Sequence, residues 1–329
     1  MEKRIKDRFN EHILQEAMKH YRINEVDIHL LDGFESFMYE FNRGDEAFIL
    51  RLAHSIRRSE NLIQGEVDWI NYLYQGGASV SQAILSEAGN LVETIPDAQG
   101  GYFLTTAFAK AQGQPPSKEM WDEALFEKYG QLIGRMHALS KNYSPPDPSW
   151  KRPEWDDPGM LDMDSWLPDS ESIVLEKYLS LKSHLDNLPH NRDSYGLIHQ
   201  DAHAGNFFLD DAGTITLFDF DDCAYSWYIN DIAIVLFYIV LGEEDENAFT
   251  REFMTHFLRG YRQENDFDAG WLKEIPPFLK LREIDLYAVI HRSFDVDNID
   301  HPWVAMYMQG RKSRIENEVP FINFDFETL

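Results

Sequence analysis

Apolar residues recur at helical spacing near the start of the chain and then give way to short β-like runs. In residues 5–22 they stand four positions apart, which predicts an amphipathic helix. The runs that follow are separated by glycine-containing turns, which is typical of hairpins. They cover residues 26–31, 37–41 and 47–52. A helix over 60–75 and two further strands, at 91–95 and 101–106, complete a sheet-rich first third.

The second part of the chain is mainly helical. Residues 112–116 contain a glycine and two prolines, which interrupt regular structure, and residues 121–140 then show the pattern of a long helix. Further helices are expected at 171–188, 230–242, 246–264, 278–294 and 300–317. A strand–loop–strand unit over 195–221 lies between the first two of these. We therefore expect an α+β protein with a small β-rich part, residues 1–106, and a large helical part, residues 107–329.

The composition narrows the class of protein. The chain has 329 residues, 43% of them apolar, so it can bury a large core. Its one cysteine, Cys223, excludes an internal disulfide and a cysteine zinc cluster, which fits a reducing compartment. The charged first residues lack the apolar core of a signal peptide, and the longest apolar run, 232–241, is about half of a bilayer crossing. We expect a cytoplasmic protein with no membrane partner.

The charge is strongly acidic. Acidic residues outnumber basic ones by 57 to 30, which gives a formal charge of -27. A field of that sign repels phosphate backbones, so a nucleic-acid partner is not expected. The same field attracts cationic small molecules, although acidity also serves solubility in many proteins.

Residues that carry chemistry gather in the strand–loop–strand unit. Phosphoryl transfer from ATP needs a carboxylate that takes the proton of the acceptor hydroxyl, and oxygen ligands that hold magnesium on the phosphates. Asp201 and Asn206 stand five positions apart across a tight loop framed by apolar strands. Asp219 ends the next strand and can approach from the other side of the hairpin. This set of residues is what a phosphotransferase site requires.

A zinc hydrolase is the alternative that these residues leave open. His199, Asp201 and His203 alternate, so on an extended strand they would share a face and could bind zinc. That interpretation gives Asn206 and Asp219 no role. The simplest alternative is a polar turn whose histidines are hydrogen-bonded locally.

The loop motif resembles that of a known family. The pattern His-x-Asp-x-His-x-Gly-Asn, followed by Asp219, is similar to the catalytic loop and metal-binding aspartate of the aminoglycoside phosphotransferase and choline kinase superfamily. The resemblance implies a bilobal protein-kinase-like fold that uses ATP and Mg²⁺. It also implies that Asp201 is the catalytic base, that His199 braces the loop, and that Asn206 and Asp219 are magnesium ligands.

The same resemblance assigns residues in the first third. The family has a lysine in its third strand that contacts the ATP phosphates and pairs with a glutamate of the next helix. Arg51 stands at the lysine position, and arginine can bind phosphate through two N–H groups. Glu66 occupies the place of the partner glutamate, with Glu60 as the second choice.

Two further segments are assigned to the nucleotide by position alone. The turn before the arginine strand would be the nucleotide loop, although it lacks a Gly-x-Gly-x-x-Gly pattern. Its residues are Asp32, Gly33, Phe34 and Ser36. The segment 103–109 would be the hinge between the lobes, whose backbone binds adenine. The residues proposed there are Ala107 and Ala109.

Two weaker matches lie in the helical part. The helix that contains Gly130, Gly134 and His137 resembles the one that opens the family's helical lobe, and its glycines by themselves indicate close helix packing. The pair Asn230-Asp231 resembles the segment whose aspartate supports the catalytic loop, and Asp231 is also a suitable helix N-cap.

The acceptor site has no short motif. The first candidates follow the metal-binding aspartate and are Asp221, Asp222, Tyr225 and Trp227. A second candidate is the segment 154–176, in which carboxylates and tryptophans suit an amine but are also typical of a solvated loop. A weaker third group consists of His291, Arg292, Asp295 and Asp297.

The sequence therefore predicts an enzyme that moves the γ-phosphate of ATP to a hydroxyl of a small molecule. An aminoglycoside, an amino alcohol, a homoserine-like alcohol or a sugar would fit, and a cationic acceptor would suit the acidic chain. A protein Ser/Thr kinase and a non-catalytic nucleotide-binding pseudokinase are alternatives of the same fold. No Ala-Pro-Glu segment follows Asp219, which disfavours the first of these.

Overall fold

The computed structural model describes residues 2–33 and 35–329. Its internal contacts divide the chain into two compact units. Unit 1 consists of Met1–Pro115, Asn142–Arg152 and Phe207–Asp221. Unit 2 consists of Pro116–Lys141, Pro153–Asn206 and Asp222–Leu329. The lobe boundary expected between residues 106 and 107 stays a prediction.

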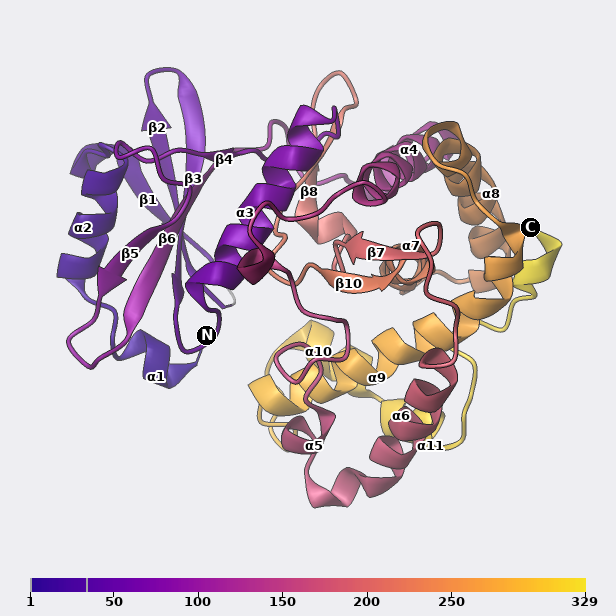
Figure 1. Cartoon of the computed structure of the whole chain (residues 1–329). Coiled ribbons are helices and arrows are strands. Elements are labelled where there is room, and N and C mark those ends of the chain that lie inside the picture. Colours follow the sequence, from indigo (N-terminus) through magenta and orange to yellow (C-terminus); the bar gives the residue numbers. More distant parts are fainter. Residues whose placement is uncertain (1, 34) are drawn as a thin grey trace. The chain divides into compact units, whose positions relative to one another are not determined.

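Unit 1 is built on an antiparallel sheet (Figure 1). Its strands are β1 (Ile28–Leu31), β2 (Phe37–Arg43), β3 (Glu46–His54), β4 (Ala83–Ile84), β5 (Glu93–Pro96) and β6 (Tyr102–Ala109). The strand order is β1-β2-β3-β6-β4, and β5 also pairs with β6. A separate hairpin of β8 (Phe207–Leu209) and β9 (Ile215–Leu217) belongs to the same unit.

The two faces of β3 serve different purposes. Phe48, Leu50 and Leu52 are buried in the core that α1 (Lys3–Lys6) and α2 (Glu11–His20) share with the sheet. Side chains alternate along a strand, so Arg51 points to the opposite face. There it meets α3 (Glu60–Gln75), a helix that has the predicted bounds.

The single helix expected over residues 5–22 is wrong. The chain forms two helices because Asn10 takes an extended conformation and its side chain accepts the N–H of Ile13, which starts α2 afresh. The helix expected over 300–317 is also divided. Gly310 adopts a left-handed conformation, with φ of 69°, between α10 (Pro302–Met308) and α11 (Arg311–Glu316).

Unit 2 is mainly helical. Besides α10 and α11 it contains α4 (Glu123–Ser140), α5 (Met163–Trp166), α6 (Ser172–Leu185), α7 (Tyr228–Ile239), α8 (Glu246–Glu264) and α9 (Ile275–Ser293). Its one ladder pairs β7 (Tyr195–Ile198) with β10 (Ala224–Trp227), a strand that the sequence pattern did not predict. Short 3-10 turns in the chain are Glu25–Asp27, Lys118–Met120, Pro148–Trp150, Asp169–Glu171, Ala204–Asn206, Ala269–Glu274 and Phe326–Thr328. Within the described residues, the helices are all too short or too polar to cross a membrane.

Helices α4 and α8 approach each other through glycines. A Cβ atom on Gly130 would lie 1.9 Å from the carbonyl oxygen of Phe257. A Cβ atom on Gly260 would lie 1.9 Å from that of Glu127. Both clashes are with backbone, which cannot move aside without separating the helices.

We therefore expect Gly130→Ala to lower the free energy of unfolding by roughly 3 kcal/mol, since it overpacks a helix contact. Gly159→Ala is the matched control, because nothing lies within 4 Å of the Cβ position there. That control should stay within about 0.5 kcal/mol of the parent. Urea unfolding of the two variants measures the difference, and equal stabilities would contradict this packing.

Candidate active site

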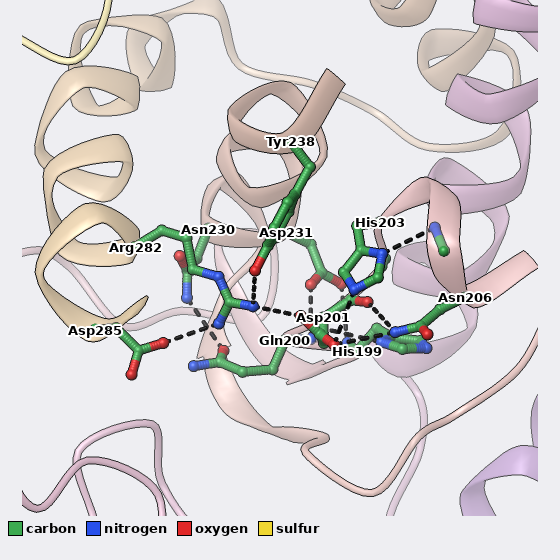
Figure 2. A network of polar contacts seen from close by, with 12 residues as sticks. His199, Gln200, Asp201, His203, Asn206, Asn230, Asp231, Tyr238, Arg282 and Asp285 are labelled. Carbon is green, nitrogen blue, oxygen red and sulfur yellow. Dashed lines mark hydrogen bonds and ion pairs between the residues drawn. The ribbon is translucent and has the colours of Figure 1, made fainter. Parts of the chain in front are cut away.

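The loop after β7 is held by a buried carboxylate of α7. The backbone N–H groups of His199 and Gln200 donate to the two oxygens of Asp231, at 2.9 and 2.8 Å (Figure 2). His137 Nε2 lies 3.2 Å from the same carboxylate, which is fully buried. Because α7 begins at Tyr228, Asp231 lies in the first turn and is not the N-cap. Asp231 thus supports the loop, and the N-cap interpretation is wrong.

Gln200, the residue before Asp201, has an unusual backbone conformation. Its φ of 69° is left-handed, a conformation that costs a side-chain-bearing residue roughly 1–2 kcal/mol. The side chain is buried, and its Oε1 accepts a hydrogen bond from Asn230 Nδ2 at 3.1 Å. Asn230 also donates to Ser226 Oγ at 3.2 Å. Strain held in place by such contacts is typical of functional sites.

Asp201 has both carboxylate oxygens engaged. Oδ2 accepts a hydrogen bond from Asn206 Nδ2 at 3.0 Å and lies 3.4 Å from His203 Nε2, while Oδ1 is paired with Arg282 (Figure 2). Burial by itself would raise the pKa of Asp201, but the charge of Arg282 and the hydrogen bond from His203 lower that pKa to about 2. At neutral pH the group is an ionised acceptor, suited to orient a hydroxyl.

Asn206 is suited to a magnesium ion through one atom. Its Nδ2 donates to both the backbone oxygen and the carboxylate of Asp201, at 2.9 and 3.0 Å. The remaining polar atom of the side chain, Oδ1, is an amide oxygen, and amide and carboxylate oxygens are the ligands that magnesium prefers. The side chain is mostly buried, so its orientation is well defined.

The zinc alternative finds no support in the loop. His199 Nδ1 accepts the backbone N–H of Asp201, and His203 Nδ1 accepts that of Gly205 at 2.9 Å. Within residues 2–33 and 35–329, no three histidine, cysteine, aspartate or glutamate side chains are placed to hold a metal ion together. The two histidines bind the backbone of their own loop instead.

In unit 1, Arg51 and Glu66 form a two-pronged ion pair. Arg51 Nη1 and Nη2 lie 2.7 and 2.8 Å from the two oxygens of Glu66, and Nε donates to Thr106 Oγ1 at 3.2 Å. Both side chains are buried, with exposed fractions of 5% and 0%. Burial lowers the pKa of Arg51, but the charge of Glu66 and its hydrogen bond outweigh burial and raise it. The guanidinium has further N–H groups that these bonds do not use.

Asp219 follows β9 in unit 1 and is exposed. Its φ of 64° is left-handed, which is uncommon for any residue other than glycine. An exposed carboxylate on a strained backbone fits the expected metal-ligand role.

The four candidate acceptor residues have different surroundings. Asp221 Oδ2 lies 2.6 Å from Arg57 and 3.4 Å from Arg58, and these arginines hold its pKa far below the usual range although burial would raise it. This engagement argues against an acceptor-binding role for Asp221. Asp222 belongs to unit 2, where burial raises the pKa of Asp285 and the charge of Asp222 adds to that effect.

The remaining two acceptor candidates lie in β10. Trp227 is fully buried and packs against Trp155, with ring centroids 5.8 Å apart, so it presents no surface to a ligand. Tyr225 is half-buried, and its backbone pairs with the chain at Glu154. Burial raises the pKa of the Tyr225 hydroxyl to about 12.

Many carboxylates of the segment 154–176 have internal partners. Glu154 accepts a hydrogen bond from Tyr195 at 2.6 Å, and Asp156 pairs with Lys182 at 2.8 Å. Glu171 is buried. These contacts favour a structural role for this acidic segment.

The two nucleotide segments are only partly open. In the β1–β2 turn, Asp32 is exposed and Ser36 is half-buried. A Cβ atom on Gly33 would lie 2.4 Å from the backbone oxygen of Ser36, so the turn is tight at this position. Phe34 lies outside the described residues. The expected hinge is strand β6. Ala107 is paired on both sides, and the N–H of Ala109 donates to the oxygen of Gln82. The N–H of Ala109 is therefore not open to a nucleotide base.

Sequence reasoning missed Arg282 and Tyr238, which the structure brings to Asp201. Arg282 comes from α9, 81 residues beyond Asp201, and no motif marks it. The available signal was a pair of opposite charges, Arg282 and Asp285, three positions apart in α9, but Lys280 and Glu283 in the same helix made this pair inconspicuous.

Comparison with known proteins supports a common origin. The model of the phosphotransferase enzyme family matches residues 28–274. Amicoumacin kinase of Bacillus subtilis strain 168 is 40% identical over 332 residues, which cover 99% of this chain and 98% of that protein.

Two solved structures extend the comparison. An amicoumacin kinase in complex with AMP-PNP, Ca²⁺ and Ami is 40% identical, with a TM-score of 0.94 over 100% of this chain and 99% of that one. A microcompartment-associated aminopropanol kinase is 23% identical, with a TM-score of 0.74 over 94% of this chain and 98% of that one. The second likeness is one of fold alone.

Proposed function

Because this chain belongs to the phosphotransferase enzyme family, we propose that it transfers the γ-phosphate of ATP to a hydroxyl group of a small, amine-bearing molecule. One observation carries the proposal. Asp201 is an ionised carboxylate in a loop whose backbone N–H groups are bound by Asp231. Asn206, which donates a hydrogen bond to Asp201, has an amide oxygen suited to magnesium. This is the arrangement that activation of an alcohol needs.

The proposed chemistry follows from single residues. The acceptor hydroxyl gives its proton to Asp201 as its oxygen forms a bond to the γ-phosphorus, and the bond from that phosphorus to the ADP oxygen breaks. Asn206 and Asp219 would each offer an oxygen to Mg²⁺, and Arg51 would donate to the phosphates. Bound Mg²⁺ would neutralise part of the negative charge of the phosphates.

Amicoumacin is the first acceptor we propose. The 40% identity to amicoumacin kinase extends across nearly the whole chain and therefore includes the helical unit 2. The net charge of -27 favours a cationic acceptor.

A panel of alcohols tests the proposal. ADP release is measured with ATP and Mg²⁺ in the presence of amicoumacin, spectinomycin, aminopropanol, choline, homoserine and an unfolded protein substrate. The product is identified by mass spectrometry as the acceptor with one added phosphoryl group. We expect transfer to an amine-bearing small molecule. Transfer to the protein alone would favour the protein-kinase alternative, and no acceptor-dependent ADP at all would overturn the proposal.

Arg51 should control the use of ATP. Arg51→Ala should raise the KM for ATP or lower kcat sharply, and Arg51→Lys should keep part of the activity because the charge survives while the two-pronged geometry is lost. Glu66→Ala should cause a smaller defect of the same kind, and the double variant should add little to Arg51→Ala. Steady-state kinetics over a range of ATP concentrations measures these effects.

Stability must be followed in the same variants. Arg51→Ala and Glu66→Ala each leave a buried charge unpaired, which costs about 3–5 kcal/mol, whereas the double variant removes both charges. The control is Arg43→Ala, which replaces an exposed arginine of β2. A folded Arg51→Ala variant with the parent's KM and kcat would show that Arg51 does not contact the nucleotide.

A further inference from the structure

Arg282 ties the carboxylate of Asp201 to the helical scaffold of unit 2. Two other partners of that carboxylate, His203 and Asn206, belong to the same loop as Asp201. Arg282 instead lies in α9, and its Nη2 donates to Asp201 Oδ1 (Figure 2). Over residues 2–33 and 35–329, no other side chain from outside the loop bonds to this carboxylate.

Arg282 is itself held from two sides. Its Nη1 donates to Asp285 Oδ2 at 2.8 Å, and its Nη2 donates to the hydroxyl of Tyr238 at 2.6 Å. The guanidinium lies over the Tyr238 ring, 5.1 Å from the centroid. These contacts leave the guanidinium little freedom to rotate.

The backbone that carries Arg282 is also fixed. The neighbouring residue in α9, Glu283, is fully buried and accepts a hydrogen bond from Arg311 Nη1 at 2.6 Å. Tyr307 donates to the backbone oxygen of Glu283 at 2.8 Å. A site residue supported in this way holds its partner in a defined geometry.

Stability alone does not explain this cluster. Arg282 is shared between the carboxylates of Asp201 and Asp285, and burial together with Asp222 raises the pKa of Asp285. Buried ion pairs add little net stability compared with apolar side chains of the same volume. The buried Nε–H of Arg282 also lacks a hydrogen-bond partner among the described residues, which is a cost.

We infer that Arg282 is a positioning residue that fixes the orientation of the Asp201 carboxylate toward the acceptor hydroxyl. The inference rests on the proposed function. A carboxylate has about four lone-pair sites, so the bonds to Arg282, Asn206 and His203 leave room for one hydroxyl. Rotation of the carboxylate away from that hydroxyl would break the bond to Arg282.

Kinetics of Arg282 variants test the inference. We expect kcat to fall ~10-fold in Arg282→Lys and ~100-fold in Arg282→Gln, while the KM for ATP changes less than about twofold. The lysine variant keeps the charge, but one ammonium group cannot reproduce the bonds to Asp201, Tyr238 and Asp285 together. Methylguanidine added to Arg282→Ala should restore part of the lost kcat.

The Asp201→Asn variant distinguishes a positioning role of Arg282 from a purely structural one. Because Arg282 acts through Asp201, Arg282→Lys should lower the residual turnover of Asp201→Asn by less than about twofold. Arg262→Gln, at an exposed arginine of α8, is the control and should keep the parent's kcat. Thermal unfolding of every variant accompanies the kinetics.

The outcomes are distinct. A parental kcat in folded Arg282→Gln, or equal losses from Arg282→Lys with and without Asp201, would overturn the inference and leave the proposed function intact. If Arg282→Gln does not fold, the inference is tested by comparing the kcat loss that Arg282→Lys causes in the parent with the loss that it causes in the Asp201→Asn variant. No phosphate transfer to any alcohol by the unaltered chain would overturn the proposed function, and the inference with it.

Discussion

Replacement of Asp201 by asparagine is expected to lower kcat by at least ~100-fold, the scale of a lost general base. Asparagine has the same shape, but it is neutral and cannot take the proton of the acceptor hydroxyl. Its NH₂ group would also face donors that now bond to the carboxylate, either Arg282 at one oxygen position or Asn206 and His203 at the other. The fold and the affinity for ATP should survive, because the loop is held mainly by Asp231 through backbone N–H groups.

Acceptor-dependent ADP release measures this effect, with ATP binding followed separately by calorimetry. Asp211→Asn is the matched control, since Asp211 is an exposed aspartate in the β8–β9 turn. Near-normal turnover of Asp201→Asn on the true acceptor would remove Asp201 from the catalytic role.

Asp219→Ala is expected to abolish the magnesium-dependent part of ATP binding. The carboxylate supplies a fixed negative charge and hard oxygen ligands, and alanine supplies neither. Alanine also adopts the left-handed backbone of this position, φ of 64°, at a cost of roughly 1–2 kcal/mol. Asp219→Asn separates the two effects, because asparagine tolerates that backbone while losing the charge.

Calorimetric titration with ATP, with and without Mg²⁺, distinguishes the outcomes. Asp219→Ala should bind ATP equally well with and without the metal, whereas the parent should bind more tightly with it. Asp219→Asn should keep only a small part of the parent's magnesium dependence, because its amide oxygen can still be a ligand but carries no charge. Retained magnesium dependence in both would show that Asp219 is not a ligand. Stoichiometric zinc at His199 and His203 would instead revive the hydrolase interpretation.

The family, the fold and the class of enzyme could be predicted from the sequence, and the comparisons confirm them. The reason is that this information is local. The loop from His199 to Asn206 is a short motif, and helix α3 and strand β3 follow from the spacing of apolar residues and from turn residues at their ends. The pairing of Arg51 with Glu66 was also expected, from the resemblance to the family's strand and helix, and the structure shows the contact.

Long-range contacts decided the rest. Asp221 and Asp222 are neighbours in sequence, yet Asp221 forms ion pairs with arginines of unit 1. The charge of Asp222 instead adds to the effect of burial in raising the pKa of Asp285 in unit 2. Arg282 reaches Asp201 across 81 residues, and hydrophobic periodicity specifies the face of a helix that is buried but not the partner that it meets. The sequence alone therefore predicted the loop, its chemistry and its support by Asp231, whereas Arg282 and Tyr238 became visible as neighbours of Asp201 only once α7 and α9 were packed.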